Sequence, residues 1–333
     1  MHRLFFASFA STAALLVAAI LGLSLWVDPF GHFRPTDGDG LDRQPAYFLN
    51  RALFKVVELK RVMADAAQHG EKVNIVVGDS TSNQIDPDIV ARAVGGRWLN
   101  MSYGKATLQE NVDLLNRIIG SYPVGEVVWN VPFERVQNYV VTTKNEMPRA
   151  WKMADEPWLH LFTFESLRAS WYVLRKRWFD VDFGDPDLGL RGAERIAYDL
   201  YSARVELNGI PWPDEFVAQR DAVEELARQN GVPLSYSRMP VHPEMQNLYV
   251  TLYADHYGRY RDLFAGRCLF DLDVARPGGW IPEQFRDAVH LEAAYRSELS
   301  QRFAAACEHP CTAHVAADQA PGAGPAMTRM VTR

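Results

Sequence analysis

Cysteine is scarce in this sequence, with three residues in a chain of 333. No Cys-x-x-Cys pair occurs, which excludes a disulfide-dense scaffold and a cysteine-rich zinc module. Cys307 and Cys311 stand close together near the carboxyl end. They could form a disulfide in an oxidising compartment or remain two unpaired thiols, and the sequence leaves both alternatives open.

An excess of positive charge is also missing. The chain has 35 Lys and Arg against 41 Asp and Glu, a net charge of -6, which argues against a basic nucleic-acid-binding surface. Its nine histidines form no His-Glu-x-x-His pattern and no close cluster with acidic residues, so we expect no metal site and no cofactor. The hydrophobic share of 48% argues against bulk disorder.

Only one apolar run is long enough to cross a membrane. Residues 4–27 carry no charge, Arg3 precedes them and Asp28 follows them. About 20 helical residues span the hydrocarbon core, and the positive-inside rule places residues 28–333 outside the cytoplasm. We therefore expect a single-pass anchor over residues 1–27 in an inner membrane, with a periplasmic domain. The alternative is a cleaved signal peptide, whose apolar core is usually only ~7–15 residues long.

Beyond the anchor, short apolar runs alternate with helical patterns. Strands are expected at 72–78, 97–101, 125–129, 232–236 and 268–272, and helices at 45–69, 107–121, 214–230, 244–265 and about 290–307. This alternation predicts an α/β domain over residues 28–311, with a doubly wound parallel sheet covered by helices on both faces. Sites in such sheets lie beyond the carboxyl ends of the strands.

Residues 135–212 interrupt this alternation and hold five of the nine tryptophans. We expect a partly helical insertion over the carboxyl edge of the sheet. The favoured interpretation is a cap that buries its own aromatic rings, and the alternative is that some rings stack on sugars. Residues 312–333 are rich in Ala, Gly and Pro and predict a disordered tail.

Candidate catalytic residues follow the predicted strands. Ser80, in Gly78-Asp79-Ser80, comes directly after an apolar strand, where it would stand exposed as a nucleophile. A serine hydroxyl needs a base, and Asp287-Ala-Val-His290 supplies one at the expected start of the last helix. His290 would take the proton, while Asp287 would orient the imidazole ring.

An oxyanion formed at an attacked ester carbonyl needs hydrogen-bond donors. Gly104 follows the second strand, where a backbone N–H without a neighbouring Cβ can approach closely. Asn130 follows the third strand and can donate from its side-chain amide. The N–H of Ser80 would complete the oxyanion hole. Four such residues at successive strand ends indicate acyl chemistry more strongly than any one of them.

With these residues the sequence resembles the SGNH (GDSL-like) hydrolase superfamily, over about 72–134 and 214–306. Its serine block matches Gly78-Asp79-Ser80, its glycine block matches residues 100–104, and its Asp-x-x-His block matches Asp287 and His290. The asparagine block departs from the family pattern, since Val128-Trp129-Asn130-Val131 stands in place of Gly-x-Asn-Asp. The resemblance implies a flavodoxin-like sheet and a serine-dependent hydrolase or transferase.

The layout more loosely resembles the membrane-anchored SGNH-like proteins of bacterial exopolysaccharide O-acetylation and teichoic-acid D-alanylation. The matching features are the anchor, the Asp28-Pro-Phe-Gly31 stretch and the delayed serine. This resemblance implies a polysaccharide acceptor and an acyl donor delivered by a membrane-bound O-acyltransferase. The stretch 239–243 is similar as well, so we include His242, together with Asp79, as a possible substrate contact.

The leading expectation is therefore acyl transfer or acyl-ester hydrolysis, with acetyl as the expected group, on a cell-envelope or secreted polysaccharide. Two alternatives stay open. One is a membrane-associated lipase or thioesterase-type esterase, and the other is a non-catalytic glycan-assembly protein.

Overall fold

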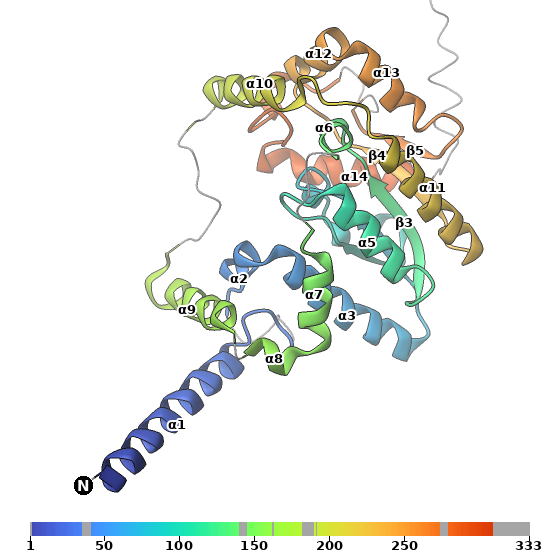
Figure 1. The fold of residues 1–333 in the computed structure, drawn as a ribbon. Coiled ribbons are helices and arrows are strands. Elements are labelled where there is room, and N and C mark those ends of the chain that lie inside the picture. Colours follow the sequence, from blue (N-terminus) through green and yellow to red (C-terminus); the bar gives the residue numbers. More distant parts are fainter. Residues whose placement is uncertain are drawn as a thin grey trace, which may run out of the picture.

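A parallel sheet of five strands forms the centre of the computed structural model, which describes residues 2–34, 41–139, 145–161, 163–181, 190, 192–273 and 279–308 (Figure 1). The strands are β1 Val73–Val77, β2 Arg97–Asn100, β3 Val124–Asn130, β4 Leu234–Arg238 and β5 Leu269–Asp271. Their spatial order is β2-β1-β3-β4-β5, and every neighbouring pair is parallel. This is the flavodoxin-like order, and it confirms the predicted doubly wound fold.

Fourteen α-helices accompany the sheet in the described part of the chain. They are α1 His2–Val27, α2 Gln44–Leu49, α3 Arg51–His69, α4 Pro87–Val94, α5 Leu108–Ile118, α6 Phe133–Gln137, α7 Met147–Asp155, α8 Pro157–Leu161, α9 Phe164–Phe179, α10 Ala193–Leu207, α11 Asp214–Gln229, α12 Pro243–Leu252, α13 Ala254–Asp262 and α14 Arg296–Glu308.

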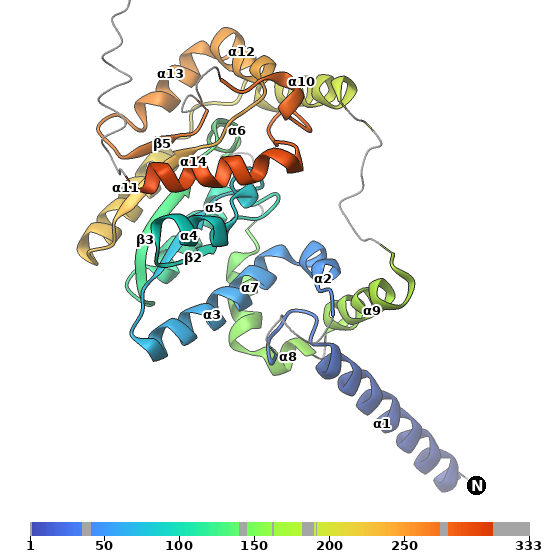
Figure 2. The ribbon, with the colours of Figure 1, turned by 180° about the vertical axis from the view of Figure 1, so that it is seen from behind.

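Both faces of the sheet are buried because its central strands are apolar along their length. Side chains alternate between the two faces of a strand, so β1 contributes Ile75 to one hydrophobic core and Val76 to the other. Residues of α3, α5, α7 and α11 complete the first core. Helices α4 and α14 close the second and pack against each other (Figure 2).

Three of the predicted helices differ from those observed. The helix expected at 45–69 is divided at Asn50, whose side chain accepts the Leu53 N–H at 2.9 Å and starts α3. The helix expected at 244–265 is divided at Tyr253. The last helix begins only at Arg296, so the prediction that Asp287 and His290 lie at a helix start is wrong. They lie in a loop.

The Trp-rich insertion does not form a single layer over the carboxyl edge of the sheet. Helices α7, α8 and α9 pack against α3, α2 and α1, and only α10 packs against α6 and α12 near the carboxyl ends of the strands (Figure 1). Trp151 is buried and Trp212 packs against the core, whereas Trp158, Trp171 and Trp178 are exposed. A cap that buries its own aromatic rings therefore describes only part of the insertion. The predicted tail at 312–333 lies outside the described residues.

For Cys307 the structure shows the second of the two alternatives that the sequence left open, a free and partly buried thiol. Cys311 lies outside the described residues. Cys268, beside β5, is disulfide-bonded.

Gly78 lets the chain turn tightly after β1. A Cβ atom at this position would lie 2.2 Å from Ser82 Oγ and 2.8 Å from Asn130 Cβ, closer than any unstrained contact. The turn that carries Ser80 therefore packs directly against the end of β3.

We predict that Gly78→Ala lowers the free energy of unfolding by about 1–3 kcal/mol, because the added methyl group must displace the turn or β3. Thermal unfolding of the purified full-length protein in detergent measures the loss. Gly258→Ala in α13 is the matched control, since no atom lies within 4 Å of its added Cβ. It should be neutral or stabilise by up to ~1 kcal/mol through helix propensity. Equal melting temperatures for the two variants would contradict the tight packing of Gly78.

Candidate active site

The carboxylate of Asp79 organises the turn at the carboxyl end of β1. Its Oδ1 accepts the Thr81 N–H at 2.9 Å and the Thr81 hydroxyl at 2.7 Å. Its Oδ2 accepts from Arg135 Nε at 3.0 Å. Asp79 is buried, so the residue predicted as a possible substrate contact is here bound within the protein. It fixes the backbone on either side of Ser80.

Ser80 itself is only partly buried. Within the described ranges, neither its hydroxyl nor its backbone N–H has a hydrogen-bond partner. Both groups remain available to a ligand at the carboxyl edge of the sheet. A nucleophile and one oxyanion donor require this availability.

Asp287 and His290 form a close pair in their loop. His290 Nδ1 lies 2.8 Å from Asp287 Oδ1 and 2.9 Å from Oδ2. A carboxylate only accepts, so Nδ1 carries the proton and Nε2 of the neutral ring is left as an acceptor. Asp287 Oδ1 also accepts the N–H groups of Val289 (3.1 Å) and His290 (2.8 Å), which closes the loop.

The environment of Asp287 keeps its carboxylate ionised. Burial on its own would raise the pKa of Asp287, but the hydrogen bond and charge of His290, the Val289 N–H and the Arg286 guanidinium together hold that pKa well below its usual range. The pair can therefore stabilise a protonated imidazole ring during a reaction.

Gln84 connects the two halves of the site. Its Nε2 donates to the Thr81 carbonyl at 3.1 Å, and its Oε1 accepts the Leu291 N–H at 3.0 Å. One buried side chain therefore separates the turn after Ser80 from the segment after His290. The two loops lie side by side without a Ser80–His290 hydrogen bond, and such bonds are often long in ligand-free enzymes.

Asn130 lies under the Ser80 turn. It is fully buried, its Nδ2 donates to Thr81 Oγ1 at 2.9 Å, and its Oδ1 has no partner in the described part of the chain. Thr81 thus joins Asp79 to the end of β3. The other N–H of Asn130 Nδ2 is the one that could donate a hydrogen bond to an oxyanion.

Gly104 faces a different neighbour. Its N–H donates to the Tyr47 hydroxyl at 3.4 Å, and its carbonyl accepts from Arg51 Nη1 at 3.0 Å. A Cβ at Gly104 would lie 3.2 Å from the same guanidinium group. The end of β2 still reaches the Ser80 turn, because Ser82 Oγ donates to Ser102 Oγ at 2.9 Å.

His242 stands beside the Asp287 loop but is almost completely buried. Its N–H donates to the Ala288 carbonyl at 2.9 Å, and its Nδ1 accepts the Glu244 N–H at 3.2 Å, which caps α12. Its Nε2 is buried and has no partner among the described residues. The structure thus brings His242 close to the Asp287 loop as a capping residue.

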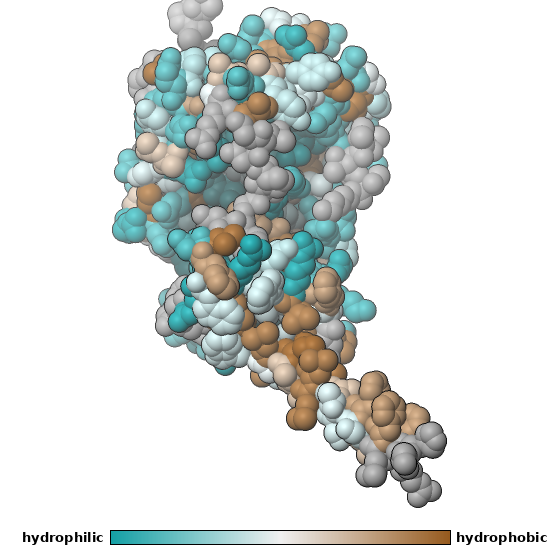
Figure 3. Space-filling model, turned by 90° about the vertical axis from the view of Figure 1, so that its left-hand side faces the viewer, coloured by the Kyte–Doolittle hydropathy of each residue, from teal (hydrophilic) through white to brown (hydrophobic). Residues whose placement is uncertain are grey.

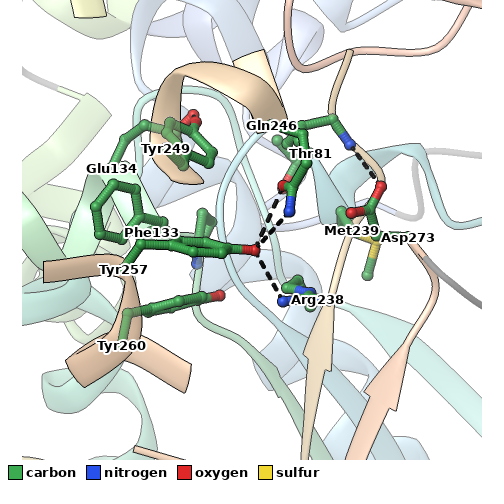
Figure 4. Close-up of a pocket in the computed structure, with 12 residues that line it drawn as sticks. Thr81, Phe133, Glu134, Arg238, Met239, Gln246, Tyr249, Tyr257, Tyr260 and Asp273 are labelled. Atoms are coloured by element: carbon green, nitrogen blue, oxygen red, sulfur yellow. Dashed lines mark hydrogen bonds between the residues drawn. The ribbon is translucent and has the colours of Figure 1, made fainter. Parts of the chain in front are cut away.

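A small hollow lies beyond Thr81, between the ends of β3 and β4 and helices α12 and α13 (Figure 4). Its volume is about 20 Å³, roughly enough for one water molecule. The Tyr257 hydroxyl accepts from Arg238 Nη1 at 3.0 Å and from Gln246 Nε2 at 2.9 Å. Burial raises the pKa of Glu134, which binds the Tyr249 hydroxyl.

Sequence reasoning missed Thr81, Gln84, Arg135 and the residues of this hollow as parts of the site. Only Thr81 had a signal, since it is adjacent to Ser80. Gln84 and Arg135 are polar residues in segments with no motif, and their partners are distant in sequence. The described residues contain no group of three or more His, Cys, Asp or Glu side chains that could hold a metal ion.

No protein-family model matches the chain, and no curated protein matches it either. One similar solved structure is described as "The structure of a putative platelet activating factor from Streptococcus pneumonia". The TM-score is 0.37 and the sequence identity 12%, over 79% of this chain and 97% of that chain. A likeness at this level carries no argument about activity, so the site rests on its own geometry.

Asp273, at the edge of the hollow, gives a pH-dependent prediction. Burial raises its pKa to about 6, so the folded state favours the neutral carboxyl, and stability falls as the pH rises from about 4 to 6. Asp273→Asn removes this penalty and should raise the melting temperature at pH 8 but hardly at pH 4. The exposed Asp255→Asn is the control and should show no such pH dependence. An equal change at both pH values would contradict the buried-carboxyl explanation.

Proposed function

We propose that the protein is a serine-dependent enzyme for acyl transfer or acyl-ester hydrolysis on a cell-envelope or secreted polysaccharide. One observation carries this proposal. His290, with its Nδ1 held by Asp287, lies in a loop joined through Gln84 to the turn that presents Ser80. The hydroxyl and N–H of Ser80 are the groups in that turn without an intramolecular partner among the described residues.

In the proposed reaction, Ser80 Oγ attacks the acyl carbonyl carbon and passes its proton to His290 Nε2. Asp287 stabilises the imidazolium that forms, and the Ser80 N–H donates to the oxyanion. The ester C–O bond then breaks, and the leaving oxygen takes the proton from His290. A sugar hydroxyl or water next attacks the acyl-Ser80 ester, with His290 acting first as base and then as acid.

The predicted contributions of Gly104 and Asn130 to the oxyanion hole require local movement. The Gly104 N–H would have to leave the Tyr47 hydroxyl, a weak bond at 3.4 Å. Asn130 would use its second N–H while keeping the bond to Thr81.

Two further features support a location outside the cytoplasm. Phe5–Val27 is long and apolar enough to cross a membrane. Cys268 is disulfide-bonded, and structural disulfides persist in oxidising compartments. Both fit an enzyme that receives acyl groups at the membrane, from a membrane-bound O-acyltransferase, and acts on a polysaccharide.

We predict that a fluorophosphonate probe labels the protein and that Ser80→Ala abolishes the labelling, because the probe forms its covalent bond with an activated serine. In-gel fluorescence of the full-length protein measures this. Ser82→Ala is the matched control, since Ser82 is buried and bonded to Ser102, and it should still be labelled. Labelling that survives in Ser80→Ala would refute the assignment of the nucleophile.

Asp287→Asn should lower turnover by roughly 10⁴-fold while substrate binding persists, because the imidazole ring loses its orienting anion. Release of acetate from an acetyl-ester donor, and acetyl-glycan formed with a polysaccharide acceptor, can be followed by mass spectrometry. If Asp287→Asn stays nearly fully active while His290→Ala is inactive, the site is a Ser-His dyad. A fully active His290→Ala variant would rule out the proposed site.

A further inference from the structure

Helix α9 carries an exposed stripe of aromatic rings. Phe164, Trp171 and Trp178 recur every seven residues and therefore lie on one face of the helix, with exposed fractions of 78%, 49% and 57%. Arg168 and Arg175 lie between them on the same face and are also exposed. We call these five residues the aromatic stripe. The opposite face of α9 is buried and consists of small and aliphatic residues: Ser166, Ala169, Ser170, Val173 and Leu174.

The stripe lies beside the outer end of α1. Helix α9 contacts both α1 and α2, and it runs crosswise to α1 in both ribbon views (Figures 1 and 2). Helix α8 also contacts α1, and its Trp158, 60% exposed, packs against Phe33 with ring centroids 4.7 Å apart. Apolar surface continues from α1 onto the adjoining base of the domain (Figure 3).

The outer turn of α1 belongs to the folded domain. Ser24, Val27 and Asp28 are fully buried. The Asp28 carboxylate accepts the N–H groups of His32, Phe33 and Arg34, each at 2.8 Å. Arg43 Nε donates to the Asp28 carbonyl at 2.9 Å. Cleavage within this turn would remove core residues, which favours a retained helix over a cleaved signal peptide.

A retained α1 that crosses a bilayer as far as Val27 places α8 and α9 at the level of the lipid headgroups. Tryptophan and phenylalanine rings are favourable in this layer, and Arg side chains extend to the phosphates. Helix α9 has four cationic residues (Arg168, Arg175, Lys176, Arg177) against one acidic residue, Glu165. This balance suits a surface of anionic phospholipid.

We propose that the aromatic stripe, together with Trp158 and the neighbouring Leu159, which is 63% exposed, lies in the interface of the bilayer that α1 crosses and binds anionic phospholipid headgroups there. The anchor and the interfacial helix then hold the domain at two places. This proposal does not depend on the acyl chemistry proposed above, because none of its residues belongs to the Ser80 site.

The test uses the full-length protein in vesicles of phosphatidylethanolamine and phosphatidylglycerol. A polarity-sensitive fluorophore is attached to the new cysteine of Trp171→Cys, in a protein that also carries Cys307→Ser. The Cys307→Ser protein without the new cysteine measures the background labelling. Tyr201→Cys is the matched control, since Tyr201 is 66% exposed on α10, which packs against α6 and α12 instead of α1. Iodide reports access from water, and lipids spin-labelled near the headgroup report contact with the interface.

We expect iodide to quench the label at 171 several-fold less than the label at 201, and the spin-labelled lipids to quench only the label at 171. Equal access of iodide to both positions would overturn the proposal.

The proposal would also be overturned if the label at 171 were shielded from iodide only after an oligosaccharide is added, because the rings would then stack on glycan. Substituting Arg168→Glu and Arg175→Glu in the labelled Trp171→Cys protein should reduce its protection, and an unchanged signal would contradict the role of anionic lipid.

Discussion

The geometry of the candidate site depends on how Asp79 is bound. A carboxylate with two oxygens can hold two separate parts of a structure, and here one oxygen closes the turn onto Thr81 while the other accepts from Arg135 on α6. Thr81 extends the same network to Asn130 at the end of β3. The Ser80 backbone therefore has little freedom, although the Ser80 side chain makes no bond of its own with the described residues. A rigid backbone with an unpartnered hydroxyl suits a group that must react.

The parallel sheet explains why distant segments meet at this point. Strand β1 lies between β2 and β3, so the segments that follow these strands leave the sheet at one edge. The turn after Ser80 is bonded to both neighbouring segments, since Ser82 donates to Ser102 and Thr81 accepts from Asn130. The loop of His290 follows β5, at the far side of the sheet, and is bonded to this region through the Gln84 side chain.

The sequence was sufficient to predict what depends on local pattern. Buried parallel strands are apolar on both faces, so all five could be located, and the Asp287–His290 pairing follows from a spacing of three residues. Contacts between distant segments could not be predicted in this way. Nothing local marks Gln84 as the partner of Leu291, or shows that α7–α9 pack on the α1 side of the domain. The late start of α14 was missed because Asp287 accepts the Val289 and His290 N–H groups as an N-cap residue does, so the local pattern imitates a helix start.

In the membrane-anchored form proposed above, the burial of Val27 in the hydrophobic core ties the folding of the domain to the insertion of α1. In that form, the end of α1 at Val27 becomes available to the domain only once the helix has settled across the bilayer. Leu23 and Phe30 pack against the same core, so an anchored α1 would give the domain a segment, already held by lipid, around which to complete its packing. A force that pulls the helix through the membrane would therefore also work against the packing of the domain. In this anchored form, the free energy of unfolding of the domain and the free energy of keeping α1 in the membrane would be thermodynamically linked.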